Sequence, residues 1–228
     1  WVSATEYQAA QLAQAGITSF ASQATSDFFA AHGWPQDAEL QASRQRGRYP
    51  ELVPSWPQQF VRLMDGQTLQ IGERRWRCLD GHGHSPEHIA LLCTEDAWCI
   101  SGDMLLPAIS SNVSVYAQEP DGDPLQGFLQ SLARMRVELP QATLVLPSHG
   151  RPFLGAHARI DALVAHHRER LEELLEACQT RPHCAHEVLP LLFGRPLNPQ
   201  QTGFAMGEAV AHLNHLWLAG RLQRVRAP

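Results

Sequence analysis

The sequence predicts a layered α/β domain followed by a small helical module. Three observations carry this prediction: closely spaced β-like segments over 68–101, helical segments that alternate with a further strand over 125–179, and short apolar helices after residue 185. Strands that alternate with helices pack as layers of sheet and helix. We therefore expect one domain over 1–155 and, over 156–228, a long helix with a winged-helix-like module.

Residues 4–48 are rich in Ala and Gln and contain no convincing strand. Helices are expected over 6–15 and 19–31, and the second ends at the stop signal His32-Gly33-Trp34-Pro35. Three prolines in 49–57 exclude a helix or a central strand there and indicate an extended connection. The segment 4–48 is therefore a helical insertion and a candidate lid.

After the prolines the pattern changes to short strands separated by Gly-containing turns, which is typical of an antiparallel meander. A helix, a β-branched strand and a long helix follow, and then two short helices and a terminal strand-like piece. In order, the strands are expected over 68–71, 74–79, 89–93 and 98–101, the helix over 125–137, the strand over 143–146, the long helix over 156–179, the short helices over 185–193 and 201–219, and the last piece over 221–226.

The composition is that of a soluble globular protein, with 228 residues and 44% hydrophobic residues. No apolar stretch approaches the roughly 20 residues that cross a bilayer, so no membrane association is expected. The formal charge of −5 argues against a dedicated nucleic-acid binder. Residues 151–228 hold 9 Arg and 7 acidic residues, a weak excess that leaves nucleic acid as a poorly supported partner. A homo-oligomer is compatible with the sequence.

Five cysteines is an odd number, and three of them, Cys78, Cys93 and Cys99, fall in apolar strand-like segments. Reduced thiols in the core are expected rather than disulfides or metal ligands, which fits a cytoplasmic protein.

The densest chemical signal is the segment Gly81-His82-Gly83-His84-Ser85-Pro86-Glu87-His88, with three histidines in a Gly-rich turn between two strands. Such a loop can direct an imidazole toward a metal, because the following strand fixes the ring. A solvated His-rich turn is an equal alternative for this loop by itself.

Two further strands end in a polar residue beside glycine. Cys99-Ile100-Ser101-Gly102 delivers Asp103, and Thr143-Leu144-Val145-Leu146-Pro147-Ser148 delivers His149. Asp103 can alternatively cap the next turn. Three strand ends thus offer His84, Asp103 and His149 as metal ligands.

In their order and spacing, "GHSPEH", "SGD" and "PSHG" resemble the metallo-β-lactamase fold superfamily of hydrolases. The resemblance implies an αββα sandwich in which His84 and His149 are ligands and Asp103 is the catalytic carboxylate that bridges two metals. It implies two divalent ions, zinc first and iron or manganese as alternatives, and hydrolysis by a metal-bound hydroxide.

The family also has an upstream HxHxDH segment, which these 228 residues do not contain. We expect this chain to be the part of the domain that follows HxHxDH, with the missing half shortly before Trp1. The alternatives are an inactive relative or a non-catalytic binding protein that kept the fold.

The segments "RPFLGAHARIDALVAHHRER" and "GEAVAHLNHLWLAGRL" resemble a branch of the superfamily with a C-terminal winged-helix-like module. That branch includes thioesterases and RNA-cleaving enzymes. A thioester or another activated acyl ester is therefore the first expectation for the substrate, and phosphodiester or RNA cleavage is the alternative.

The remaining polar residues are weaker candidates. His82, His88 and His167 are candidates for substrate contact or for hydrogen bonds to the ligands, and simple solvation is the alternative for His82 and His88. Glu87 and Asp80 are candidates to orient a ligand imidazole. Neither Ser85 nor Ser148 lies in a G-x-S-x-G elbow, so a serine nucleophile is not expected.

Overall fold

The computed structural model describes residues 1–15, 23–35 and 53–225, and it has the expected mixed α/β architecture. The chain divides into two compact units, each assembled from three separate stretches. The first unit comprises Trp1–Ala9, Pro57–Asn112 and Gln126–His167, and the second unit comprises Ala10–Trp56, Val113–Leu125 and Arg168–Pro228.

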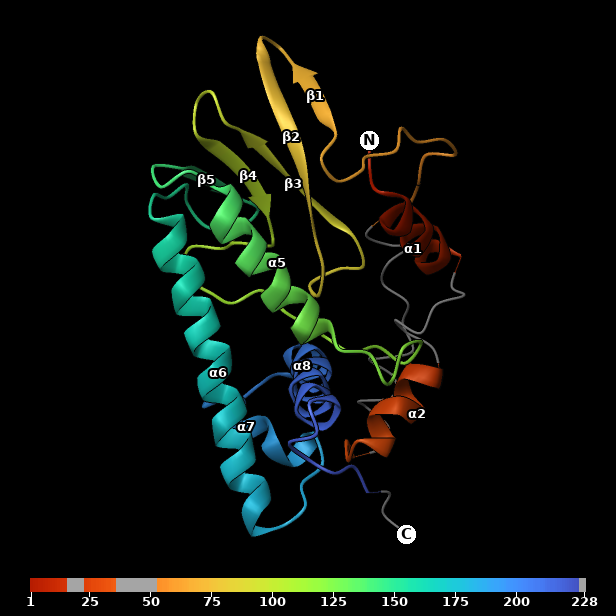
Figure 1. Cartoon of the computed structure of the whole chain (residues 1–228). Helices are drawn as coiled ribbons and strands as arrows, with labels where there is room; N and C mark the ends of the chain where they lie inside the picture. The colour runs from red at the N-terminus through yellow and green to blue at the C-terminus, as the bar shows by residue number, and fades with distance from the viewer. Residues whose placement is uncertain (16–22, 36–52, 226–228) are drawn as a thin grey trace. The chain divides into compact units, whose positions relative to one another are not determined.

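The first unit is built on a five-stranded sheet with the order β1-β2-β3-β4-β5 (Figure 1). The first four strands form the predicted antiparallel meander, and β5 pairs with β4 in parallel. Strands β2, β4 and β5 therefore run in one direction, and their C-terminal ends reach the same edge of the sheet. The strands are β1 (Thr68–Ile71), β2 (Arg74–Gly81), β3 (His88–Cys93), β4 (Trp98–Gly102) and β5 (Leu144–Pro147).

Alternation along the meander buries one row of side chains in an apolar cluster. Trp76 and Cys78 of β2 pack there with Leu69 of β1 and Cys93 of β3. All five cysteines are free thiols, and Cys78, Cys93 and Cys99 are fully buried, as the sequence predicts. Burial raises the pKa of the Cys99 thiol to about 12, so this group stays protonated at physiological pH.

Helices α5 (Pro124–Glu138) and α6 (Ala156–Thr180) add apolar stripes to this unit. Phe128, Leu132 and Met135 of α5 recur at helical spacing and are all buried. Ile160 and Leu163 form the corresponding stripe near the start of α6. Removal of a side chain such as Phe128 from water stabilises the fold by about 2–3 kcal/mol.

An ion-pair network connects α5 to the end of β2 that leads into the His-rich loop. Arg134 of α5 pairs with Asp80 of β2, with Asp65 at 2.6 Å and with Glu138 at 3.3 Å. Glu138 also accepts a hydrogen bond from Arg77 of β2. The hydrogen bonds from Arg77 and then Arg134 outweigh partial burial and hold the pKa of Glu138 below its ordinary value.

The second unit is helical in its described part, and its elements share one apolar cluster. Phe29, Trp34, Leu174, Met206 and Leu216 are among its buried members. These elements include α2 (Gln23–Ala31), a 3₁₀ turn (His186–Val188), α7 (Leu189–Phe193) and α8 (Pro199–Leu218).

Helix α8 begins at a capping box in the second unit. The Asn198 side chain accepts from the Gln201 backbone N–H at 2.9 Å, and the Gln201 side chain accepts from the Asn198 N–H at 3.2 Å. Two backbone donors that the helix cannot satisfy itself are paired in this way. No helix in the described part of the chain is long and apolar enough to cross a membrane.

Most predicted boundaries agree with the structure to within one or two residues. Helix α1 (Ala4–Gln14) begins two residues before the predicted start, because the Glu87 carboxylate accepts the Thr5 N–H at 3.1 Å. This contact joins residues 82 positions apart and leaves no local signal in the sequence. The predicted helix over 19–31 is described only from Gln23, and residues 19–22 lie outside the described part.

The predicted strand over 221–226 is wrong for its described part, 221–225, which forms no strand. Arg226 lies outside the described residues. The backbone N–H groups of Arg221 and Leu222 bond to the Leu216 carbonyl, which turns the chain back on α8. Arg224 then stacks on the Trp217 ring at 3.8 Å and donates to Asp121 at 2.7 Å. Contacts made by side chains of this segment therefore replace the ladder that a strand would need.

The substitution Arg134→Met tests the network at the end of β2. It leaves Asp65 and Asp80 without their shared cation, so the free energy of unfolding at pH 7 should fall by about 1–2 kcal/mol. Because Glu138 has a lowered pKa, its stabilisation is present above its ordinary value of 4.5 and is lost as the pH falls through the pKa of the folded state. The difference between Arg134→Met and wild type should therefore shrink at pH 3.

Urea unfolding at both pH values measures this effect. The control is Arg75→Met, which removes only the exposed pair between Arg75 and Glu95 and should cost about 0.5 kcal/mol or less. Equal losses for the two variants at pH 7 would contradict the prediction.

Candidate functional site

The fold brings His84, Asp103 and His149 together at one edge of the sheet. His84 lies in the loop after β2, Asp103 directly follows β4, and His149 follows β5 by two residues. His84 Nε2 is 3.5 Å from Asp103 Oδ2, and His149 Nε2 is 3.5 Å from Asp103 Oδ1. The three residues meet because their strands run in the same direction.

A backbone carbonyl fixes the orientation of His84. Its Nδ1 lies 2.9 Å from the carbonyl oxygen of Asn112, which can only accept, so Nδ1 carries the proton. In the neutral imidazole, Nε2 then presents a lone pair toward Asp103. A metal-binding histidine usually donates its other ring N–H to a carbonyl or carboxylate in this way, which fixes the orientation of the ring.

Asp103 holds its two carboxylate oxygens toward different imidazoles. Oδ1 is buried and has no hydrogen-bond partner, and the ring it faces is that of His149. A buried carboxylate oxygen without a hydrogen-bond donor is unfavourable. A cation near this oxygen would relieve that cost.

The donor set therefore fits a divalent metal ion, since imidazole nitrogen and carboxylate oxygen are ordinary ligands of zinc, iron and manganese. Within residues 1–15, 23–35 and 53–225, no group of three or more His, Cys, Asp and Glu side chains is arranged to hold a metal ion by itself. These three residues would by themselves supply only part of a coordination shell, and an ion there would need further donors. The 70% exposure of the His149 side chain leaves that side of the group open to solvent.

His88, at the start of β3, packs against the C-terminal end of β4, the strand that Asp103 follows. Burial, and then the neighbouring His84, lowers the pKa of His88, so its ring is neutral at pH 7. Its buried Nδ1 has no hydrogen-bond partner. The ring packs against Gly102, where φ is +55° and an added Cβ would overlap it. His88 therefore supports the backbone that positions Asp103.

The other sequence candidates lie elsewhere in the first unit. His82 is half exposed; its Nδ1 is 2.9 Å from the Pro86 carbonyl oxygen and its Nε2 is 3.4 Å from Asp80. His167 of α6 is fully buried with its ring edge-on to Phe128, and this burial favours packing. Substrate contact by His82 or His167 stays a prediction.

The expectation that Asp80 or Glu87 orients a ligand imidazole is not met for His84. Asp80 pairs with Arg134 and His82, and Glu87 accepts the N–H of Thr5 at the start of α1. The partner of His84 is instead the backbone carbonyl of Asn112, 28 residues away. Backbone carbonyls are present at every residue, so no side-chain pattern could have identified this one.

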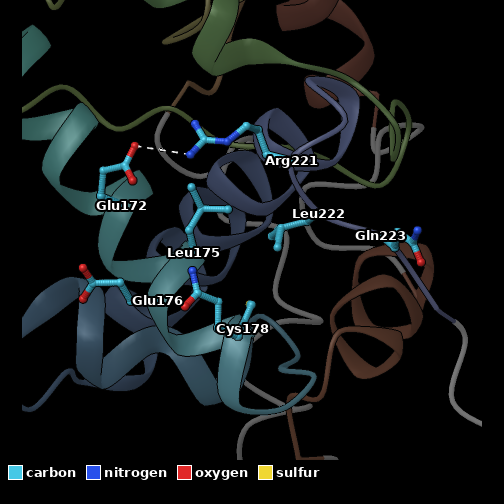
Figure 2. Close-up of a pocket in the computed structure, with 8 residues that line it drawn as sticks. Glu172, Leu175, Glu176, Cys178, Arg221, Leu222 and Gln223 are labelled. Carbon is cyan, nitrogen blue, oxygen red and sulfur yellow. Dashed lines mark ion pairs between the residues drawn. The ribbon is translucent and has the colours of Figure 1, made fainter.

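The second unit contains a hollow of about 480 Å³ that includes none of the predicted site residues (Figure 2). Glu172, Glu176 and Cys178 line it from α6, and Arg221 and Leu222 line it from the segment after α8. Arg221 and Glu172 pair with each other at 3.6 Å. Their charges are therefore already partly compensated.

Comparisons with known proteins agree with the fold. Residues 171–228 match the family described as metallo-beta-lactamase-like, C-terminal domain. The chain is 30% identical over 149 residues to the probable metallo-hydrolase YqjP of Bacillus subtilis (strain 168), which covers 64% of this chain and 46% of the relative.

Two solved structures are similar over nearly the whole chain. A beta-lactamase domain protein from Burkholderia ambifaria matches with a TM-score of 0.91 and 45% identity, over 100% of this chain and 63% of that one. A metallo-beta-lactamase family protein from Thermus thermophilus matches with a TM-score of 0.77 and 29% identity, over 96% of this chain and 66% of that one. The chain thus spans 46% to 66% of the length of these three relatives.

The contact between Gly102 and His88 can be tested with Gly102→Ala. A residue with a Cβ at positive φ costs about 1–2 kcal/mol, and displacement of the His88 ring adds about 1–3 kcal/mol. The matched control is Gly72→Ala, because Gly72 has a similar φ of +61° and no atom within 4 Å of an added Cβ. Urea unfolding should show a larger loss of stability for Gly102→Ala, and equal losses would refute the contact.

Proposed function

Because this chain is similar to metallo-β-lactamase family proteins over nearly its whole length, we propose that the protein is a metal-dependent hydrolase whose site includes His84, Asp103 and His149. The observation that carries the proposal is the position of Asp103, whose two oxygens each lie 3.5 Å from a different imidazole nitrogen. One of these oxygens is buried without a hydrogen-bond donor. Such a group is best stabilised by cations.

In the proposed site, His84, Asp103 and His149 would help to hold two divalent ions, zinc in the first instance. The geometry of Asp103 supports two ions rather than one, since His84 and His149 each approach a different oxygen of its carboxylate. Iron or manganese would accept the same donors. Bound ions supply a lowered pKa for coordinated water, from 15.7 to about 7, and polarisation of the bond under attack.

The residues of the chain prepare the site in three ways. The Asn112 carbonyl keeps His84 in the tautomer that presents Nε2 to the site. The position of Asp103 after Gly102 holds its carboxylate at the edge of the sheet, with His88 packed behind the backbone. The exposed ring of His149 leaves a side of the group accessible to substrate.

For the substrate, we propose a thioester or another activated acyl ester. The branch of the superfamily that "GEAVAHLNHLWLAGRL" resembles includes such enzymes. His84, Asp103 and His149 would hold the ions that supply electrostatic stabilisation of an oxyanion, so the chemistry needs no serine nucleophile.

The substitution Asp103→Ala tests the function in protein purified from the full-length gene. It should lower the metal content per chain and reduce thioester hydrolysis by more than about 100-fold, because it removes the shared ligand. The fold should remain intact, which circular dichroism checks. The control Asp161→Ala removes an exposed carboxylate that pairs with Arg136, and it should retain both metal and activity.

Elemental mass spectrometry measures the metal, and a panel of thioester, phosphodiester and β-lactam substrates measures the activity before and after chelation. Activity that chelation abolishes and zinc restores supports the proposal. Wild-type-like hydrolysis by Asp103→Ala would refute the assigned site, and a wild-type protein without metal would refute the function.

A further inference from the structure

A single loop, residues 103–112, connects all three residues of the proposed site. Asp103 begins this loop, and Asn112 at its end supplies the carbonyl that orients His84. In the middle, Pro107 packs on Gly150, the neighbour of His149, where φ is +88° and an added Cβ would lie 2.6 Å from the proline ring. The conformation of this loop therefore sets the position of every member of the group.

The loop contains no helix or strand, so its backbone groups must find other partners. Near its start, the Ser101 hydroxyl donates to the Leu105 carbonyl at 2.9 Å, and the Ser111 hydroxyl donates to the Asp103 carbonyl. Met104, Leu105 and Leu106 are buried and anchor the first half. The segment around Ile109 is exposed and has no such apolar anchor.

Arg159, in the first turn of α6, holds this less anchored part. Its Nε donates to the Leu106 carbonyl at 2.7 Å, and its Nη2 donates to the Ile109 carbonyl at 2.7 Å. The planar guanidinium presents these donors in a fixed fork, so one side chain sets the spacing of two carbonyls. Helix α6 packs in the core through Ile160 and Leu163, which makes its first turn a rigid base.

We propose that Arg159 is a positioning residue for the metal site, which acts through the loop 103–112 on Asp103 and on the Asn112 carbonyl. The inference rests on the proposed function. It assigns Arg159 no contact with metal or substrate, and its effect reaches the ligands only through the backbone. Residues that orient metal ligands in this way typically contribute 10–100-fold in metal affinity.

The test compares Arg159→Met and Arg159→Lys with the control Arg136→Met, in protein purified from the full-length gene. Arg136 joins α5 to α6 through Asp161 at 2.7 Å and His157 at 3.1 Å, and both of these partners lie on α6. Zinc affinity is measured by competition with a chromophoric chelator. Both Arg159 variants should bind zinc about 10–100-fold more weakly than wild type, because Lys keeps the charge and loses the fork. Arg136→Met should remain within about twofold of wild type.

A second measurement does not depend on metal. Hydrogen exchange in the chelator-treated protein should be faster over 103–112 in Arg159→Met and unchanged there in Arg136→Met. Ser111→Ala, which removes the hydroxyl bonded to the Asp103 carbonyl, should raise exchange in the same loop and weaken zinc binding in the same direction. This variant serves if Arg159→Met fails to fold.

The outcomes separate this inference from the function on which it rests. If wild type binds zinc and the Arg159 variants bind it equally well, the positioning role is overturned and the hydrolase proposal stands. If exchange over 103–112 is unchanged in Arg159→Met, the role is also overturned. If wild type binds no metal, the proposed function and the role of Arg159 toward a metal fail together.

Discussion

The parallel pairing of β5 with β4 is the constraint on which the candidate site depends. An antiparallel meander alone would place the ends of β2 and β4 at one edge and offer His84 and Asp103. The crossover through α5 returns the chain so that β5 runs in the same direction, which brings His149 to that edge. A parallel crossover needs a dozen or more residues and usually a helix, and 103–143 supplies both. The same segment provides the loop that arranges the site.

Electrostatics explains why these residues fit a cation rather than one another. Asp103 faces two imidazoles, with Nε2 of His84 and Nε2 of His149 each 3.5 Å from one of its oxygens. Burial of Oδ1 without a hydrogen-bond donor costs free energy. His88 is kept neutral by burial and so adds no compensating positive charge. The protein thus maintains a buried carboxylate oxygen that lacks a donor, a feature typical of a functional site.

Rigid elements surround this constellation on several sides. Arg134 holds the end of β2 against α5 ahead of the His-rich loop, and Arg159 holds the Asp103 loop from α6. Arg134 pairs with the carboxylates of Asp65 and Asp80, and Arg159 donates to two backbone carbonyls of a loop that has no helix or strand. Ligand geometry that is set by such contacts can persist when no ion is bound, which favours a preorganised site.

The sequence alone determined the order of the elements, because apolar periodicity and Gly-Pro punctuation are local properties. It also determined His84, Asp103 and His149 as a group, since each follows a recognisable strand. It did not determine the start of α1 at the Glu87 carboxylate, the course of 221–225 along α8, or the Asn112 carbonyl behind His84. Only the tertiary structure decided these features, because they depend on groups far apart in the chain and on backbone atoms that every residue shares.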